Sequence, residues 1–390
     1  MPCVRACWIS STRYSQPLNA TQAKKWAALA AAGMDITVVG FATDAHWRRF
    51  SQSARFILLP LLPFALLRYA LMFVLTPLLL FRLAWRGRVN TFIAQSPYEG
   101  FPAALARQLL ALCGRRTALL VEAHGDFEES LFLYRRIPFA SVVRWLMRRV
   151  SDYTLHHADA LRAVSSTTQA QLQQRAAGKP IEQFLTWTDV EVFQNTPRTL
   201  APSASHDLLY VGQLVPLKGV HLLIDAFAQV CAVSHAAHLH LIGRPDNAEY
   251  AAQLQEQVVR LGLQERVTFT GALDQAQLAG RLAAARALIL PSFSEGMPRV
   301  LVEAMVCGTP VIATRVGGVP DLVQTDRNGW LIDARDTEAL AGALHNLLTS
   351  ADVDALGATA RTDATALFST EQYVDGYRRL FAHAERALCP

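Results

Sequence analysis

The segment from Pro291 to Val323 constrains the possible folds more than any other part of this chain. An apolar strand candidate, Ala287–Leu290, comes just before it. A helix is predicted over Arg299–Cys307, because a proline stands at its start and a glycine and a proline follow its end. A second strand candidate, Val311–Thr314, follows directly. A strand, a helix and a strand in such close succession form a parallel unit, so the segment predicts an α/β domain.

Two carboxylates lie eight positions apart in this segment. Glu295 falls in the turn before the predicted helix, and Glu303 falls within the helix. Between them the helix N-terminus offers free backbone N–H groups, which attract phosphate. A glutamate accepts hydrogen bonds from sugar hydroxyls. The combination suits a nucleoside diphosphate sugar, and an ordinary helix start with one solvated and one core-facing glutamate is the alternative.

Strand and helix candidates alternate along both halves of the chain. In the second half the alternation is regular from Leu208 to Thr314. In the first half the strand candidates are Val4–Ser10, Asp35–Gly40, Thr91–Gln95 and Thr117–Glu122. This pattern predicts two doubly wound parallel α/β domains. A length of 390 residues and a hydrophobic content of 52% are sufficient for two such cores.

A second motif, YVGQLVPLKGV at Tyr210–Val220, lies between a strand candidate and a helix candidate. Lys218 supplies a positive charge, and Gly219 lets the backbone approach a ligand closely. The pair therefore predicts an anion site, with an unliganded surface turn as the alternative.

His124 follows the strand candidate Thr117–Glu122. Parallel α/β sheets bind ligands at the carboxyl ends of their strands. A neutral imidazole at that edge can hydrogen-bond a sugar hydroxyl, and a histidine that merely closes a strand is the alternative. Asp126, two residues further on, is a weaker candidate for an acceptor contact.

The wording EGMPRVLVEAMVCGTPVIATRVGGVPD, which begins at Glu295, resembles the E-x7-E signature of retaining nucleotide-sugar glycosyltransferases, and within that group family 4. Lys218 matches the lysine of the family's V-G-R-L-x-x-x-K-G motif, whereas Gln213 stands where the family has arginine. That departure removes one positive charge from the expected diphosphate site. Shorter matches lie at Ala158–Ser165 and around Asp189.

This resemblance implies the GT-B fold, in which two Rossmann-like, doubly wound domains face a cleft. The expected bounds are residues 1–193 for the domain that binds the acceptor and 194–367 for the domain that binds the nucleotide sugar. A C-terminal helix, residues 368–390, is expected to cross back to the first domain. The implied reaction moves a sugar from a UDP- or GDP-sugar to a hydroxyl with retention at the anomeric carbon. The leaving phosphate takes the acceptor proton, so neither a metal ion nor a cofactor is expected.

The resemblance also implies roles for single residues. Glu295, Lys218 and His124 are the expected catalytic residues. Lys218 and the helix N-terminus would stabilise the leaving diphosphate, Glu295 would hold a sugar hydroxyl, and Glu303 would hold the ribose. The residues expected to bind the donor are Gln213, Gly219, Gly296, Met297, Pro298, Glu303 and Leu273.

The family's Gly-Gly loop after the first strand has no counterpart here. The corresponding segment is Ser10–Asn19, which contains no glycine. Arg13 is a candidate phosphate ligand in that loop. Together with Tyr14 and Asp126, it is also a candidate for contacts with the acceptor.

An apolar stretch, Phe56–Phe81, carries one charge, Arg68, and three prolines. About twenty apolar residues are needed to span a bilayer, and a central arginine costs about 2.5–3.5 kcal/mol on insertion scales. Between Phe41 and Val150 there are fifteen Arg and no Lys, against six Asp and Glu. Arginines on both flanks favour a segment that lies in the membrane interface. Burial in the core and spanning are the alternatives.

The basic, apolar first half therefore predicts contact with an anionic membrane surface. The expected acceptor is a lipid-linked saccharide or a glycolipid, as in the biosynthesis of polysaccharide, lipopolysaccharide or glycolipid. Six scattered cysteines without disulfide or zinc spacing favour a reduced compartment. No apolar run typical of a signal peptide stands near the start. The predicted location is the cytoplasmic face of the membrane, held peripherally.

Three alternatives come from other functional classes. A sugar-nucleotide epimerase or hydrolase of the same fold would share the diphosphate site but would leave Phe56–Phe81 unexplained. A non-catalytic membrane scaffold would explain Gln213 and the missing glycine loop as signs of decay. Nucleic-acid binding rests only on a net charge of +5, without a recognised module, and is not expected.

Overall fold

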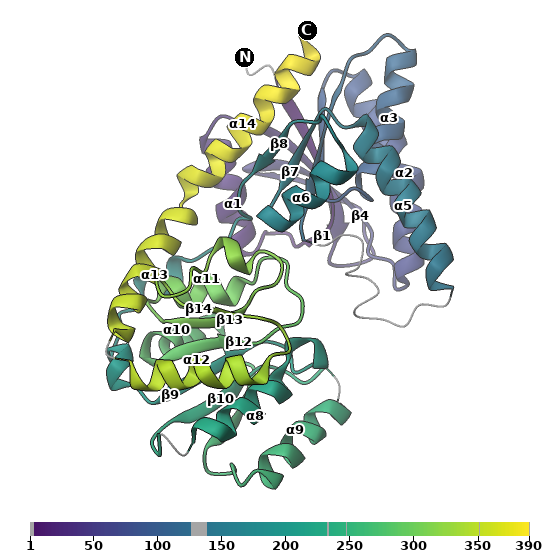
Figure 1. Ribbon diagram of the computed structural model, residues 1–390. Coiled ribbons are helices and arrows are strands. Elements are labelled where there is room, and N and C mark those ends of the chain that lie inside the picture. The colour runs from purple at the N-terminus through teal and green to yellow at the C-terminus, as the bar shows by residue number, and fades with distance from the viewer. Residues whose placement is uncertain (1–3, 126–138, 232–233, 247, 351, 390) are drawn as a thin grey trace. The chain divides into compact units, whose positions relative to one another are not determined.

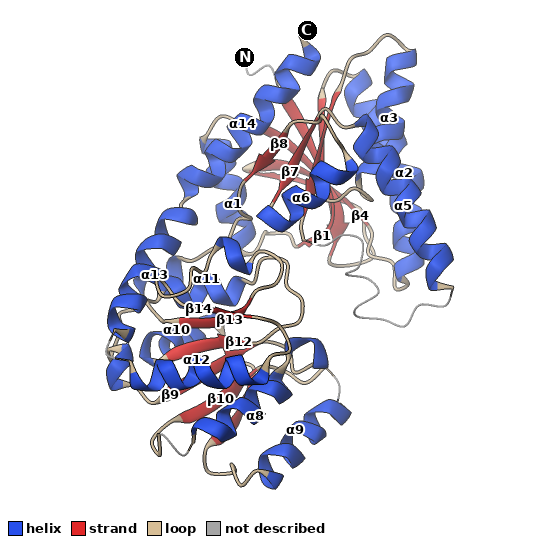
Figure 2. Ribbon diagram, viewed as in Figure 1, coloured by secondary structure: helices blue, strands red, loops and turns tan. Residues whose placement is uncertain are grey.

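The computed structural model describes residues 4–125, 139–231, 234–246, 248–350 and 352–389 (Figure 1). The chain forms two compact units. The first consists of Met1–Trp187 together with Thr370–Pro390, and the second of Thr188–Ser369. Helices and strands alternate in both units, as Figure 2 shows. The first unit is therefore discontinuous in sequence, since its last helix comes from the end of the chain.

A mixed sheet forms the centre of the first unit. Its described strands number eight, in the order β3-β4-β2-β1-β5-β6-β7-β8. Neighbouring strands are parallel except β3, which pairs with β4 in the antiparallel sense. The strands are β1 (Arg5–Tyr14), β2 (Asp35–Ala42), β3 (Arg48–Gln52), β4 (Ala54–Leu59), β5 (Thr91–Ala94), β6 (Ala118–Ala123), β7 (Ala160–Ala163) and β8 (Ile181–Gln183). The reversal of strand order at β1 confirms the predicted doubly wound sheet.

Helices cover both faces of this sheet. The helices are α1 (Ala20–Ala31), α2 (Ala65–Trp85), α3 (Gly100–Leu112), α5 (Ala140–His157), α6 (Ser166–Arg175) and α14 (Thr370–Leu388). In Figure 1, α2, α3 and α5 lie together on one side and α1 and α14 on the other. The α14 side has an aromatic core, in which the rings of Trp26 and Tyr377 each lie 5.2 Å from that of Trp8. Burial of one large apolar side chain contributes about 1.5–3 kcal/mol, so this core binds α14 firmly to the first unit.

The apolar stretch Phe56–Phe81 is not one segment. Its first four residues belong to β4, in the interior of the sheet, and α2 begins only at Ala65. The treatment of the whole stretch as a single interfacial unit was therefore wrong. Among the described residues, Leu67–Trp85 is long and apolar enough to cross a membrane, and a third of it is buried inside the protein.

The second unit is built on a parallel sheet. Its described strands number six, in the order β11-β10-β9-β12-β13-β14. They are β9 (Asp207–Val211), β10 (His238–Ile242), β11 (Val267–Gly271), β12 (Ala287–Leu290), β13 (Val311–Thr314) and β14 (Trp330–Ile332). The helices are α7 (Glu191–Asn195), η1 (Pro202–Ala204), η2 (Pro216–Lys218), α8 (Val220–Val230), α9 (Ala248–Arg260), α10 (Gln275–Ala284), α11 (Arg299–Val306), η3 (Val319–Asp321), α12 (Thr337–Thr349) and α13 (Val353–Leu367). Because β9, β12 and β13 are adjacent and parallel, the loops after them meet at one edge.

Helix α11 begins at Arg299 as predicted, with Pro298 as its N-cap. One boundary differs from the sequence predictions at a place that matters for the site. Strand β1 runs on to Tyr14, through part of the segment expected to be a loop. It extends because its last residues pair with Phe41 and Ala42 of β2 after an irregularity in register.

Candidate active site

Lys218 and Glu295 meet at the carboxyl edge of the second sheet. Lys218 ends η2, in the connection after β9, and Glu295 lies in the loop after the neighbouring strand β12. The Nζ of Lys218 donates to Oε1 of Glu295 over 2.6 Å. The hydroxyl of Ser292 donates to the same oxygen, also over 2.6 Å. The structure therefore brings together two residues that sequence analysis assigned to catalysis, although they are 77 positions apart.

This ion pair is only partly enclosed. The side chain of Lys218 is 17% exposed and that of Glu295 is 9% exposed. Among the described residues, the hydrogen bonds to Glu295 end on Oε1, so Oε2 stays free to accept another. A carboxylate oxygen beside an ammonium group can hold a hydroxyl while the ammonium contacts an anion.

Two glycines allow the loops of the site to pack. Gly219 has φ +66°, and a Cβ there would lie 2.2 Å from the carbonyl oxygen of Pro291. Gly317, in the loop after β13, has φ +53°, and a Cβ there would lie 1.7 Å from the carbonyl oxygen of Glu295. A side chain at either position would combine backbone strain with a collision. The turn that carries Glu295 is thus held by glycine contacts from both adjacent loops.

The helix N-terminus expected between the two glutamates is present. Gly296 and Met297 precede the N-cap Pro298, and the carbonyl of Gly296 accepts from the N–H of Gly318 over 2.7 Å. The first-turn N–H groups of α11 form a positive end beside the ion pair of Lys218 and Glu295.

Glu303 is buried within α11. Its described ion-pair partner is Arg299, one turn earlier, at 3.7 Å. Burial raises the pKa of Glu303, and Arg299 counteracts that shift. The structure thus gives Glu303 a separate position inside the helix, and its role in holding the ribose stays a prediction.

The remaining donor candidates lie on neighbouring loops. Gln213 is exposed, and its carbonyl accepts from the buried hydroxyl of Tyr210 over 2.7 Å, which anchors the loop after β9. Leu273 is half-buried and directly precedes Asp274, whose side chain forms a capping box with Gln277 at the start of α10. Their contacts with a donor stay predictions.

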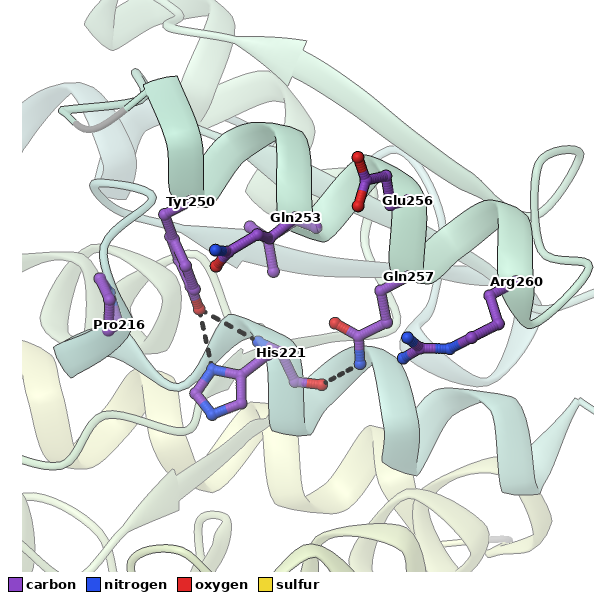
Figure 3. A pocket seen from close by; sticks show the side chains of 8 residues that line it. Pro216, His221, Tyr250, Gln253, Glu256, Gln257 and Arg260 are labelled. Atoms are coloured by element: carbon purple, nitrogen blue, oxygen red, sulfur yellow. Dashed lines mark hydrogen bonds between the residues drawn. The ribbon is translucent and has the colours of Figure 1, made fainter.

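A pocket of about 440 Å³ lies between α8 and α9 (Figure 3). It is lined by Pro216, His221, Tyr250, Gln253, Leu254, Glu256, Gln257 and Arg260. The hydroxyl of Tyr250 lies 2.8 Å from Nδ1 of His221, and Gln257 donates to the carbonyl of His221 over 2.9 Å. Sequence analysis named none of these residues, and several of their polar groups are already bonded within the protein.

In the first unit, His124 stands at the carboxyl end of β6. Its side chain is 30% exposed, and its Nε2 lies 2.8 Å from Oε2 of Glu122, which is fully buried. Arg162 of β7 lies 3.2 Å from the same oxygen, and the hydroxyl of Tyr377 of α14 donates to Oε1. Sequence analysis missed Glu122 and Tyr377, because no local pattern joins residues 255 positions apart.

These neighbours set the charges around His124. Burial alone would raise the pKa of Glu122, but Arg162, with hydrogen bonds from His124 and Tyr377, holds it well below its ordinary value. Desolvation lowers the pKa of His124, and the charges of Arg162 and Lys25 lower it further. The hydrogen bond and the charge of Glu122 raise this pKa, but by less. At neutral pH, Glu122 is therefore ionised and His124 is neutral.

The two described residues predicted to contact the acceptor lie in different environments. Arg13 is exposed on β1, at the same edge of the sheet as His124. Tyr14 does not lie in an open loop: it is buried between Trp26 and Phe56, and burial raises its pKa to about 12. Its expected place in an acceptor loop was wrong, because β1 continues through it. Asp126 lies outside the described residues.

Sequence analysis also missed Glu99, just before α3. It is buried, one oxygen accepts from the N–H of Ser11, and burial raises its pKa to about 7. In the part of the chain that the structure describes, no three His, Cys, Asp or Glu side chains form a group that could hold a metal ion.

Two family profiles match the chain. The family described as "Glycosyl transferase 4-like domain" matches residues 19–183, and "Glycosyl transferases group 1" matches residues 205–350. The first range falls in the first unit and the second in the second unit. Lys218, Glu295 and Glu303 all lie within the second range.

Curated relatives include the D-inositol 3-phosphate glycosyltransferases of Geodermatophilus obscurus and Mycobacterium marinum. They are 34% identical over 174 residues and 33% identical over 205 residues. These matches cover 43% and 49% of this chain, and 38% and 43% of the relatives. The chain thus spans about two fifths of the length of the relatives it matches.

Solved structures match nearly the whole chain. Sucrose-phosphate synthase from Thermosynechococcus elongatus has a TM-score of 0.72 at 24% identity, over 97% of this chain and 99% of that one. Anabaena HepE in complex with UDP-glucose has a TM-score of 0.68 at 20% identity, with the same coverage. The lipopolysaccharide outer core galactosyltransferase WaaB has a TM-score of 0.70 at 17% identity, over 96% and 99%. These similarities establish the fold of both units.

Proposed function

The chain belongs to the family 4 glycosyltransferases and has their GT-B fold, and from that premise we propose that it transfers a sugar from a nucleoside diphosphate donor to a hydroxyl group with retention of configuration. The observation that carries this proposal is the ion pair of Lys218 and Glu295, which lies beside the N-terminus of α11 at the ligand-binding edge of a parallel sheet.

The geometry supports a division of labour in the reaction. Cleavage of the bond between sugar and phosphate builds positive charge on the anomeric carbon and negative charge on the diphosphate. The ammonium of Lys218 and the first-turn N–H groups of α11 would stabilise the negative charge. The free Oε2 of Glu295 would accept a hydrogen bond from a sugar hydroxyl. The ion pair keeps both side chains oriented until the donor arrives.

The proposed donor is a UDP- or GDP-sugar. Structural neighbours support the uridine option, because HepE has been solved with UDP and with UDP-glucose. Gln213, in place of the family's arginine, leaves Lys218 with more of the diphosphate charge to neutralise.

We extend the proposal to a lipid-linked saccharide or glycolipid acceptor and to peripheral attachment at the cytoplasmic face of a membrane. Helix α2 exposes Val74 and Leu78, while α5 exposes Trp145 and Leu146. Both helices pack against α3. The exposed arginines of these helices and of the turn after α2 are Arg82, Arg86, Arg88, Arg148 and Arg149. Apolar side chains among arginines suit the interface of an anionic bilayer.

The packing of α2 supports interfacial attachment over spanning. Met72, Leu80 and Leu83 are buried against the core of the first unit, as are Thr76 and Pro77. A spanning helix would have to leave these contacts and place Arg68 in the hydrocarbon. WaaB, whose name refers to lipopolysaccharide, supports the acceptor class, while the inositol phosphate relatives favour a soluble acceptor as the alternative.

The test of donor and chemistry is nucleotide release from a panel of UDP- and GDP-sugars, with and without a membrane-lipid extract. Release from one donor, lost in Glu295→Ala and Lys218→Ala and increased by the extract, is the expected result. Glu256→Ala, an exposed glutamate on α9, is the matched control and should retain activity. Release that is independent of both residues would overturn the proposed site.

The test of membrane attachment is cosedimentation with vesicles containing an anionic lipid. Replacement of Arg82, Arg86 and Arg88 by Glu should abolish binding. The matched control replaces three exposed arginines of the second unit by Glu: Arg244, Arg260 and Arg281. Equal binding by both triple variants would refute the assignment of the membrane-facing surface to α2.

A further inference from the structure

Glu122 binds three side chains from three different places in the first unit. Its Oε2 lies 2.8 Å from Nε2 of His124 and 3.2 Å from Nη1 of Arg162. Its Oε1 accepts from the hydroxyl of Tyr377, and that hydroxyl in turn accepts from Nη1 of Arg162 over 2.8 Å. Glu122 and Arg162 are fully enclosed, with side chains 0% and 1% exposed. The group is therefore a closed network with a single member, His124, at the surface.

The network determines where the imidazole carries its proton. Arg162 keeps Glu122 ionised, and an ionised carboxylate only accepts hydrogen bonds. The Nε2 of His124 must therefore be the donor. In a neutral ring, this leaves Nδ1 with its lone pair. The hydroxyl of Thr186 lies 3.4 Å from Nδ1, longer than a good hydrogen bond of this type.

Aromatic packing holds Tyr377 of the C-terminal helix α14 in place beside Glu122. The ring of Tyr377 is fully buried and packs 4.9 Å from Phe184 and 5.2 Å from Trp8. A tyrosine held this way cannot swing its hydroxyl away from Glu122. Helix α14 is thus connected to His124 at the surface through the buried carboxylate of Glu122.

We propose that Tyr377, Arg162 and Glu122 are positioning residues, which hold His124 as the Nε2–H tautomer so that Nδ1 accepts a hydrogen bond from a hydroxyl of the sugar substrate. The identity of that hydroxyl rests on the proposed function. The tautomer does not, because it follows from contacts within the first unit alone.

Within the part of the chain that the structure describes, charged and titratable groups face this network from each element packed against it. They are Glu122 on β6, Arg162 on β7, Lys25 on α1, Tyr373 and Tyr377 on α14, Tyr14 on β1 and Glu99 before α3. The ammonium of Lys25 lies 4.1 Å from the centre of the Trp8 ring. Two cations against one ionised carboxylate disfavour a third positive charge on His124, which keeps its ring neutral at neutral pH.

The first experiment is nitrogen-15 NMR of the full chain with labelled histidine, which reports the tautomer of His124 directly. The wild type should show Nε2–H. Tyr377→Phe keeps the ring packing but removes a donor that fixes the position of Glu122. Because Arg162 still keeps that carboxylate ionised, His124 should remain the Nε2–H tautomer in this variant. Glu122→Gln should lose the single tautomer and lower the pKa of His124 further, because it removes the one charge that raises this pKa.

The second readout separates positioning from general stability. Loss of a residue that orients a metal-ligating histidine costs about ten- to a hundredfold in activity. We expect a loss at the lower end of that range here, so Tyr377→Phe should lower kcat by about tenfold. Its affinity for UDP or GDP should not change. His383→Ala is the control, because it removes a different polar contact of α14, 2.9 Å from Glu182, and touches none of the groups around Glu122. It should leave the tautomer unchanged.

A wild-type Nδ1–H tautomer, an unchanged single Nε2–H tautomer in Glu122→Gln, or an unchanged kcat in Tyr377→Phe would overturn the proposal. If Glu122→Gln fails to fold, the wild-type tautomer and the kcat of Tyr377→Phe decide. Absence of sugar transfer from every donor, with the tautomer shifting as expected, would refute the proposed function and leave the positioning network intact.

Discussion

Each of the two units contains an ion pair near the carboxyl ends of parallel strands, but the pairs are built in opposite ways. Lys218 and Glu295 are joined by one contact, are partly exposed, and leave a carboxylate oxygen free. Glu122 and Arg162 are buried, and Glu122 is also hydrogen-bonded to His124 and Tyr377. The first arrangement suits a pair that exchanges partners with a ligand. The second suits a pair that holds another residue still.

The difference also separates stability from activity. Breaking a fully buried pair leaves an uncompensated charge in a medium of low dielectric constant, whereas breaking a pair that water partly reaches costs less. Variants of Glu122 and Arg162 should therefore act mainly on folding, and variants of Lys218 and Glu295 mainly on turnover.

The largest effect is expected from Arg162→Ala. It leaves the buried carboxylate of Glu122 without its cation and should lower the free energy of unfolding by about 3–5 kcal/mol. Chemical denaturation followed by the fluorescence of the buried Trp8 and Trp26 would measure it. A loss as small as that of an exposed pair would remove the distinction between the two units.

Lys218→Ala should give the reverse pattern. Loss of one preorganised charge beside the leaving group lowers kcat by on the order of 10²–10³. The loss of folding stability should be smaller than that of Arg162→Ala, because water reaches part of Lys218 and Glu295. Steady-state kinetics and thermal denaturation of the same preparation would test both halves. A large drop in melting temperature would show that this pair, too, is structural.

Acid should act on the two units in opposite directions. The folded-state pKa of Glu122 lies near 2, below its ordinary value of 4.5, so its stabilising contribution is complete above pH 4.5 and is lost as pH falls toward 2. The pKa of Glu303 is raised, so its ionisation costs stability as pH rises through and above its ordinary value. Glu303→Gln should therefore raise the melting temperature at neutral pH and leave the acid limb unchanged. A loss of stability at neutral pH would contradict this sign.

The smallest effect is expected from Tyr210→Phe. It removes one hydrogen bond, from the hydroxyl to the carbonyl of Gln213, and should cost about 0.5–1.5 kcal/mol of stability. Because that bond anchors the loop before Lys218, the KM for the donor should rise. Tyr250→Phe, which loses a similar bond to His221 in the pocket of Figure 3, should leave the KM unchanged. Equal effects on KM would show that the Gln213 loop is not specifically tied to the donor.

The strands and the helix around Glu295 in the second unit were predicted well from the sequence, because their signals are local. The bounds of β12, α11 and β13 follow from apolar runs, a proline and a glycine that act over a few residues. Lys218 and Glu295 lie far apart along the chain, yet each follows its own strand. Adjacent parallel strands bring such residues to one edge without further information.

The first unit was predicted less completely. Tyr14 was expected in a loop, but pairing with β2 extends its strand and packing against Trp26 and Phe56 buries it. The stretch Phe56–Phe81 was treated as one segment, although its first four residues belong to strand β4 of the sheet. Local composition measures how apolar a residue is but not which neighbour covers it.

The sequence by itself determined the fold class and the family, because these depend on periodicity and on motifs read within short windows. Only the tertiary structure decided that Glu122 holds His124, and that Tyr377 reaches Glu122 from 255 positions away. The reason is physical: burial, tautomer and charge pairing depend on which side chains packing brings within about 3 Å. Nothing in the local sequence of either residue encodes that distance.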